Sequence, residues 1–319
     1  MKSPTLDRTA LRNFLSESAV ILILGVFVLF MIASKPSFYT WGNIANILTE
    51  FSVYGITACA MTVAIICGEF DLSASAVFAW STILFVSMVK MLGLAPAMAI
   101  TIVSGAAWGI LNGFLVARMK MSAFIVTLAT MTIAQGLAFF YTNGVPINTS
   151  DEALLAIGNF RVVGLSLTTL VFAVVLVFFA FVLRKTRFGR NIYATGGNIE
   201  VARLAGINVT YYKFIIFVIL GVCAALSAIM FSTRIRAGSA LYGRDLSLYC
   251  VAATVIGGTS LSGGNGGVMK TLVGLLVVSI LYNALTLLGV QGYFQQLIRG
   301  IVLIVVIMTD AFINRKSDS

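Results

Sequence analysis

The chain has 319 residues, of which 60% are hydrophobic and only 10% are charged. A soluble domain of ordinary composition is about 45–50% apolar and about 25% charged, so this composition excludes a water-soluble globular fold. The net charge of +10 does not indicate nucleic-acid binding, because the basic residues lie in short loops beside apolar runs, where membrane topology accounts for them.

Apolar runs of membrane-spanning length recur along the whole chain, separated by short polar segments. Because a bilayer core needs roughly 20 apolar residues per helix, we expect one all-α, polytopic transmembrane domain over residues 1–319 with about ten spans. The run 246–256 is too short to cross comfortably, which predicts a broken helix whose ends lie inside the protein. The expected spans are 19–33, 52–67, 74–92, 97–117, 123–141, 165–183, 214–232, 246–256, 268–288 and 297–312.

The basic residues predict the orientation of these spans. We interpret 19–33 as a retained first helix, because Lys35, Pro36 and aromatic residues follow it in place of a small-residue cleavage site. An N-terminus on the inside places 14 of the 21 Lys and Arg residues in inner loops, and an even span count then leaves both termini in the cytoplasm. The outer segments 34–50 and 142–164 are long enough for short interfacial helices.

A short internal echo is consistent with an inverted repeat. The sequence Asp-Leu-Ser begins at Asp71, before the third span, and again at Asp245, before the eighth. With five spans in each half, equivalent links lie on opposite membrane faces, as in many transporters. A chance match of three residues is the alternative.

A few polar groups lie between or inside apolar runs and are candidates for a solute pathway. Asp71 has two interpretations: an N-cap of the following helix, and a group that helps the helix end to face a polar solute. The polar groups inside spans have the simpler alternative of hydrogen bonds between helices. We assign the pathway to Phe70, Asp71, Ser73, Asn112 and Asn283.

The sequence contains no typical metal or nucleotide site, so we expect no metal and no cofactor. Histidine is absent, and the four cysteines lie in apolar runs without a C-x-x-C spacing, as small packing residues do. The glycine-rich segment 257–267 resembles a phosphate-binding loop, but Met269 stands where that loop requires glycine before Lys270. Its glycines therefore indicate a tight turn or close helix approach.

The inner segment of about 184–213 is the longest predicted cytoplasmic loop. Asn198 is placed to cap a short helix that ends near Gly206, and such a helix lying along the membrane suits the docking of a soluble partner. A merely solvated basic loop is the commoner alternative.

Several ordered motifs resemble the permease subunits of bacterial ABC importers for monosaccharides, of the ribose, xylose and arabinose type. The resemblance covers nearly the whole chain after the first helix, and its most specific part is GRNIYATGGN at 189–198, similar to the coupling segment of that family. The other matches are Ala202-Arg203-Leu204, GINV at 206–209, FIVTL at 124–128, YTNG at 141–144 and VIGGTSL at 255–261.

This resemblance implies a subunit of a larger machine in the bacterial inner membrane. Two permease copies would form a pathway for a monosaccharide that a periplasmic binding protein delivers, within membrane lipid. Two separate ATPase subunits would dock on the cytoplasmic side and hydrolyse ATP, so the chain itself would not be an enzyme. The residues expected to couple it to the ATPase are Arg190, Asn198, Glu200, Ala202, Arg203 and Gly206.

Two departures from the family pattern put a familiar pentose in doubt. Glu69 stands where the family commonly has Gly, before Phe70-Asp71-Leu72, and Ser247-Leu248-Tyr249 stands where the family often has Glu-Leu-Asp. A permease for branched-chain amino acids or nucleosides is the alternative within transport. An ion-coupled secondary transporter would favour acids in mid-span, whereas the acids here lie at span ends and in loops.

Overall fold

The computed structural model describes residues 31–298 without interruption, and residues 25, 28, 29, 300, 301, 304 and 308 singly. Apart from two pairs of two-residue strands, the regular structure of this described part is helical, which confirms the all-α prediction. The elements are η1 (Pro36–Tyr39), α2 (Trp41–Ile66), α3 (Ala74–Leu92), α4 (Leu94–Gly113), the π-helix η2 (Phe114–Arg118), α5 (Ala123–Thr142), β1 (Ile147–Asn148), α6 (Glu152–Asn159), β2 (Arg161–Val162), β3 (Leu165–Ser166), α7 (Leu167–Lys185), α8 (Arg187–Gly197), α9 (Ile199–Leu204), α10 (Val209–Ile235), β4 (Ala237–Gly238), α11 (Leu246–Ile256) and α12 (Val268–Leu287).

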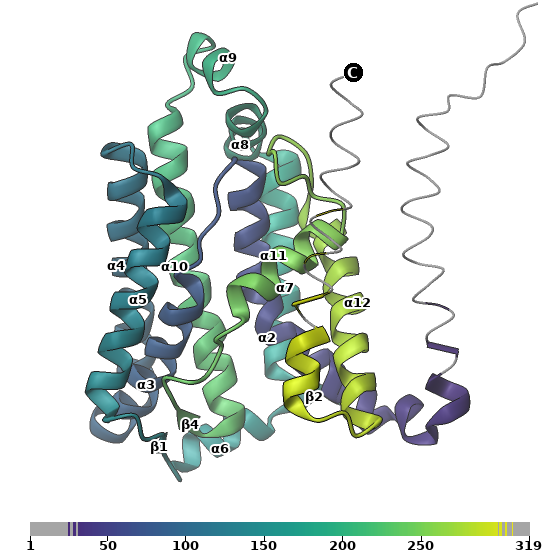
Figure 1. Cartoon of the computed structure of the whole chain (residues 1–319). Helices are drawn as coiled ribbons and strands as arrows, with labels where there is room; N and C mark the ends of the chain where they lie inside the picture. Colours follow the sequence, from purple (N-terminus) through teal and green to yellow (C-terminus); the bar gives the residue numbers. More distant parts are fainter. Residues whose placement is uncertain are drawn as a thin grey trace, which may run out of the picture.

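The long helices form a bundle around α2. Figure 1 shows α8 and α9 at one end of this bundle, and α6 with the small strand pairs at the other. β1 pairs antiparallel with β4, and β2 with β3. We refer to these two ends as the α9 end and the α6 end.

Seven of the described helices are long and apolar enough to cross a membrane, and α11 is a shorter apolar helix. On the central helix α2 nearly all of the second half is buried, as in a helix that is apolar all round. The outer helices instead leave large apolar side chains exposed, such as Phe140 on α5 (83%) and Val174 on α7 (70%). This outward apolar surface is what a lipid-facing helix requires, so the chain is a multi-pass membrane protein.

Eight of the ten expected spans correspond to the helices α2, α3, α4, α5, α7, α10, α11 and α12. The other two, 19–33 and 297–312, lie largely outside the described residues. The segment 34–50, expected to be long enough for a short interfacial helix, is only partly separate from the second span. It contains η1 and the first turns of α2, because the hydroxyl oxygen of Thr40 accepts a hydrogen bond from the Asn43 amide (3.4 Å) and starts the helix there. The segment 142–164 does contain a short helix, α6.

A seam of glycines joins α4 to α10. Gly105, Gly109 and Gly113 lie one turn apart on α4, and a Cβ on any of them would meet backbone atoms of α10. Gly221 on α10 has the reciprocal relation to Gly105, since a Cβ there would overlap the Gly105 carbonyl oxygen. Small residues at this spacing let two helix backbones approach closely inside a membrane.

Two helices start in the interior of the bundle, with their N-termini facing each other. The segment 67–73 leads from α2 back into the bundle to α3, and 239–245 leads from β4 into it to α11 (Figure 1). The Ser247 hydroxyl oxygen accepts a hydrogen bond from the Ser75 amide (3.0 Å), and the Ser75 hydroxyl oxygen accepts one from the Ser247 amide (2.8 Å). Each half-helix therefore caps the other. This confirms the broken helix predicted at 246–256, whereas the interior start of α3 was not predicted.

The two Asp-Leu-Ser sequences are not equivalent in this arrangement. Asp71 lies two residues before Ser73, the N-cap position of α3, whereas Asp245 is itself at the N-cap position of α11 and makes no side-chain cap hydrogen bond. The equivalent residues are instead Ser75 and Ser247, each the second residue of its helix. The two Asp-Leu-Ser sequences thus lie at the two interior helix starts, but their positions relative to the helix starts differ by two residues.

We expect Ser75→Ala and Ser247→Ala each to lower the free energy of unfolding by about 0.5–2 kcal/mol, the usual effect of losing a helix cap. Because both serines belong to one reciprocal pair, the double variant will lose less than the sum of the two. Denaturation of the purified protein in mixed micelles measures this. Thr132→Ala, which removes an exposed hydroxyl bonded within α5, is the control and will shift stability by less than about 0.5 kcal/mol. Strictly additive losses would contradict the reciprocal pairing.

Candidate functional site

Three of the predicted pathway residues meet in a buried network next to the break before α3. One carboxylate oxygen of Asp71 accepts hydrogen bonds from the amide (2.7 Å) and the hydroxyl (2.6 Å) of Ser73. The side-chain amide of Asn112, on α4, donates to the Ser73 hydroxyl (2.8 Å) and to the other Asp71 oxygen (3.4 Å). Within the described residues the Asn112 carbonyl oxygen has no hydrogen-bond partner. This network ties the segment before α3 to the face of α4.

The other two predicted pathway residues lie elsewhere. Phe70 packs its ring against Phe124 at the start of α5, with ring centroids 6.4 Å apart. Asn283 on α12 exchanges two side-chain hydrogen bonds, of 3.0 and 2.8 Å, with Asn43 in the first turn of α2. The structure thus separates the five predicted residues into three places.

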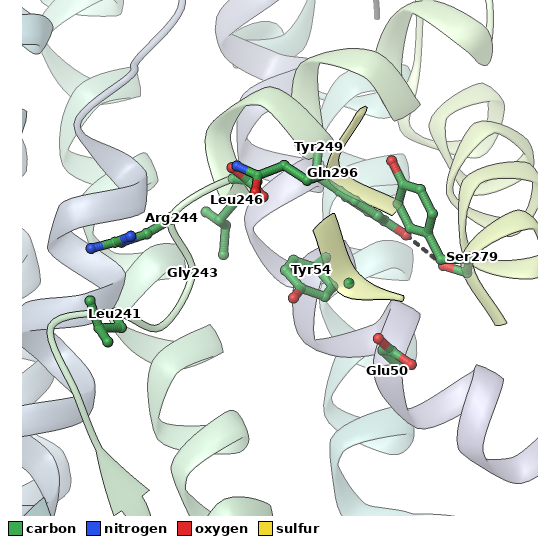
Figure 2. Close-up of a pocket in the computed structure, with 12 residues that line it drawn as sticks. Glu50, Tyr54, Leu241, Gly243, Arg244, Leu246, Tyr249, Ser279 and Gln296 are labelled. Atoms are coloured by element: carbon green, nitrogen blue, oxygen red, sulfur yellow. Dashed lines mark hydrogen bonds between the residues drawn. The ribbon is translucent and has the colours of Figure 1, made fainter. Parts of the chain in front are cut away.

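A cavity of about 270 Å³ opens between α2, α11, α12 and the segment that leads into α11. The Tyr249 hydroxyl is 2.5 Å from that of Ser279, and the ring of Tyr249 stacks on Tyr54 with centroids 4.6 Å apart. Figure 2 shows this hydroxyl pair as a dashed line, with Tyr54 and Glu50 on successive turns of α2. The lining residues are Glu50, Tyr54, Leu241, Gly243, Arg244, Asp245, Leu246, Tyr249, Ser279, Tyr282, Gly292 and Gln296.

This cavity was not predicted from the sequence, and none of the five predicted pathway residues lines it. Its walls come from four stretches that are far apart in the chain, so no local pattern connects them. One signal was present in the sequence: Glu50 is the single charged residue within what is now α2, and an ionisable residue there indicates a functional face.

The segment 184–213 folds into two short helices at the α9 end. Thr186 caps α8 through the Gly189 amide (3.2 Å), and the Asn198 side chain caps α9 through the amides of Glu200 (3.0 Å) and Val201 (3.1 Å). The turn after α9 contains Gly206 with a φ of +79°, a conformation that favours glycine. The predicted cap and helix end are therefore confirmed.

Glycines at the α9 end bring three backbone segments into direct contact. A Cβ at Gly196, in the last turn of α8, would overlap the carbonyl oxygen of Ile66 at the end of α2. That same oxygen accepts a hydrogen bond from the Gly264 amide (2.8 Å), within the predicted tight segment 257–267. We call the contact of these three segments the glycine junction.

Two side-chain contacts reinforce this end of the bundle. The Tyr193 hydroxyl on α8 donates to the Gly266 carbonyl oxygen (2.8 Å), and burial raises the pKa of Tyr193, which keeps it protonated as a donor. Glu69, just after α2, forms a largely buried ion pair with Lys213 in the first turns of α10. Glu69, unexplained by the sequence, is thus neutralised by a neighbouring helix.

Residues 43–307 match the family described as the permease component of branched-chain amino acid transport systems. The chain belongs to this permease family. Among curated relatives, the ribose import permease of Bacillus subtilis (strain 168) is 37% identical over 90% of this chain and 91% of that protein. The ribose import permease of Haemophilus influenzae is 35% identical over 95% of this chain and 96% of that protein.

The L-arabinose transport system permease of Escherichia coli (strain K12) is 34% identical over 91% of this chain and 90% of that protein. No solved structure matches the chain. The full-length similarity to two kinds of sugar permease confirms the resemblance drawn from the motifs, and the permease is a transport protein whose relatives are not enzymes.

We expect Gly196→Ala to destabilise the permease by about 1–3 kcal/mol, the usual effect of forcing atoms into a packed contact. The added methyl group would push α8 away from the end of α2. Thermal denaturation in detergent measures the loss. Gly42→Ala, in the first turn of α2 with no atom within 4 Å of the new methyl group, is the matched control and will be neutral or slightly stabilising. Equal stability of the two variants would exclude a close junction.

Proposed function

We propose that the permease is the membrane subunit of an ATP-driven importer and forms the pathway for a monosaccharide that a periplasmic binding protein delivers. Its full-length similarity to ribose and L-arabinose permeases carries this proposal. The family description also names branched-chain amino acids, but the relatives with these identities are sugar permeases.

The α9 end is the cytoplasmic end in this proposal, and both termini lie on the cytoplasmic side of a bacterial inner membrane. Basic residues support this orientation, because they are concentrated beside the helix ends there, from Arg118 to Lys120, from Arg184 to Arg203, and at Lys213 and Lys270. The exposed apolar side chains of α4, α5 and α7 would then contact membrane lipid.

The helix α9 is the docking element for the ATPase subunit. It stands at the tip of the bundle (Figure 1), where the side chains of Leu204 (88%) and Val201 (60%) are exposed although both are apolar. Exposed apolar side chains on a capped, projecting helix suit a groove on a soluble partner. The sequence analysis named neither residue as a contact.

The predicted coupling residues have separate tasks around this helix. Asn198 and Gly206 define where α9 begins and ends, and Ala202 packs inward, with 2% exposure. Glu200 and Arg203 form an exposed ion pair (3.0 Å) on the same short helix as the apolar contact surface, and Arg190 lies on α8, the helix before it. These residues shape and orient the docking helix, whereas Val201 and Leu204 supply its contact area.

Coupling then follows from the glycine junction. ATP binding would close the two ATPase subunits and move α9 with α8, and α8 contacts both the end of α2 and the segment 257–267. The first of these leads into α3 and the second follows α11, so both half-helices would move together. The ATPase biases the pathway between its two open states by binding one of them more tightly. Asp71, Ser73 and Asn112 would hold the α3 break during this change.

We expect sugar uptake to require ATP and to survive a protonophore. The experiment reconstitutes the permease with its ATPase subunits and binding protein in liposomes and supplies ribose, xylose, arabinose and, as the alternative class, leucine. The isolated permease will hydrolyse no ATP, because its only phosphate-loop-like segment departs from the required pattern. Collapse of uptake with the proton gradient would favour a secondary transporter, and uptake of leucine alone would replace the sugar assignment.

We expect Leu204→Asp to weaken ATPase binding by about thirtyfold or more, because it places an unpaired carboxylate in the apolar contact, and the loss of a hot-spot residue costs about 2 kcal/mol or more. Co-purification of the ATPase with the permease measures the loss, and gel filtration shows that the permease itself remains folded. Val163→Asp is the control at the α6 end, since Val163 is equally apolar and 91% exposed. Undiminished co-purification of the Leu204 variant would exclude α9 as the dock.

A further inference from the structure

Charged and polar side chains are exposed on one face of the bundle at membrane depth. At about 1.5 Å per residue, Glu50 lies about 14 Å from one end of α2 and about 24 Å from the other. Arg244 immediately precedes the N-cap of α11, the helix that starts inside the bundle. Gln296 belongs to the helical residues 292–298 that follow α12. All three side chains are exposed, and all three line the same cavity.

Exposure at this depth has a different meaning for polar and apolar residues. On α4 and α7 the exposed residues in mid-helix are apolar, for example Val103 (67%), and lipid can cover them. On α5 the exposed Thr132 hydroxyl is bonded within its own helix to the Leu128 carbonyl oxygen. A carboxylate or guanidinium exposed at the same depth is costly in lipid and is found facing a partner or a water-filled cavity. The face that carries Glu50 and Arg244 is therefore turned away from lipid.

The cavity on this face carries the groups that a sugar requires. Tyr54 and Tyr282 both pack on the buried Tyr249, with ring centroids 4.6 and 5.8 Å from it, and together they form an aromatic wall for the apolar C–H side of a sugar ring. Glu50, Ser279 and Gln296 present oxygen and nitrogen atoms that exchange hydrogen bonds with hydroxyl groups. A few polar groups on an aromatic wall are typical of small-molecule sites.

The arrangement suits a neutral polyol better than a zwitterion. In Figure 2 the Arg244 side chain extends away from the tyrosines, so the groups closest to the rings are a carboxylate, hydroxyls and an amide. An amino acid would need a cation for its carboxylate beside those rings. A polyol needs only donors and acceptors, which the acidic and hydroxyl groups supply.

We propose that this cavity is a solute-binding site on the pathway, specific for a polyhydroxylated ligand, and that it faces the second copy of the permease across a water-filled space. The identity of the ligand rests on the proposed function, whereas the contact of the cavity with water does not. It places the solute against α2, α11 and α12. The broken helix contributes through residues 241–249, in line with the discontinuous helices that surround substrates in other transporters.

Single cysteines test the water-filled face independently of transport. The four native cysteines are all buried, so an introduced cysteine is the main target of a hydrophilic thiol reagent. In the assembled complex in lipid nanodiscs, we expect the reagent to modify Glu50→Cys and Gln296→Cys and to leave Val103→Cys on α4 unmodified. Protection of both cavity positions, or equal modification of Val103→Cys, would overturn the inference.

Uptake by the reconstituted importer tests the ligand. We expect Glu50→Gln, which changes charge but not size, to reduce monosaccharide uptake about ten- to hundredfold, the effect of losing hydrogen bonds to a charged group. The matched control Glu152→Gln, in the first turn of α6, will transport normally. Normal uptake by Glu50→Gln would exclude this site for the sugar. Wild-type uptake of leucine but not of sugars would refute the proposed function and the ligand, while the cysteine result still decides whether water reaches the cavity.

Discussion

A backbone inside a membrane has no water to satisfy its polar groups, and the whole arrangement of this permease depends on how that constraint is met. Two helices begin in the interior, where their first amides have no partner in their own helix. Ser75 and Ser247 resolve this by capping each other's helix, so neither end stands alone. The pair lets the chain change from extended segment to helix at this depth. That change places residues 241–249 beside α2, where the cavity forms.

Around this pair, close packing of glycines divides the protein into parts with different roles. The seam between α4 and α10 brings two backbones into contact and supports α3, which packs on both helices. The glycine junction links α8 to the end of α2 and to the segment after α11. The seam between α4 and α10 favours a stiff support for α3. In the proposed mechanism, the glycine junction would pass a displacement at the α9 end to both half-helices, since backbone-to-backbone contacts have no flexible side chains to absorb it.

Sequence reasoning succeeded where the signal is local. Apolar runs predicted eight of the described helices, the short run 246–256 predicted a broken helix, and Asn198 and Gly206 predicted the limits of α9. It did not find the cavity, because Glu50, Arg244, Tyr249 and Gln296 meet only after distant segments pack. The Asp-Leu-Ser echo was misleading in register, since the pairing depends on which residue is second in each helix. The spacing of Gly105, Gly109 and Gly113 indicates a close contact between two helices, but this contact was not predicted.

The two facing half-helices differ in length, with 19 residues in α3 and 11 in α11. At 3.6 residues per turn, the first has about five turns and the second about three, so the meeting point lies off-centre, closer to the α9 end. In the proposed importer, a solute that has passed the serine pair would have only the three turns of α11, about 16 Å, between it and the α9 end. Occlusion on that side would then depend on the glycine-rich segment 257–267 that follows α11.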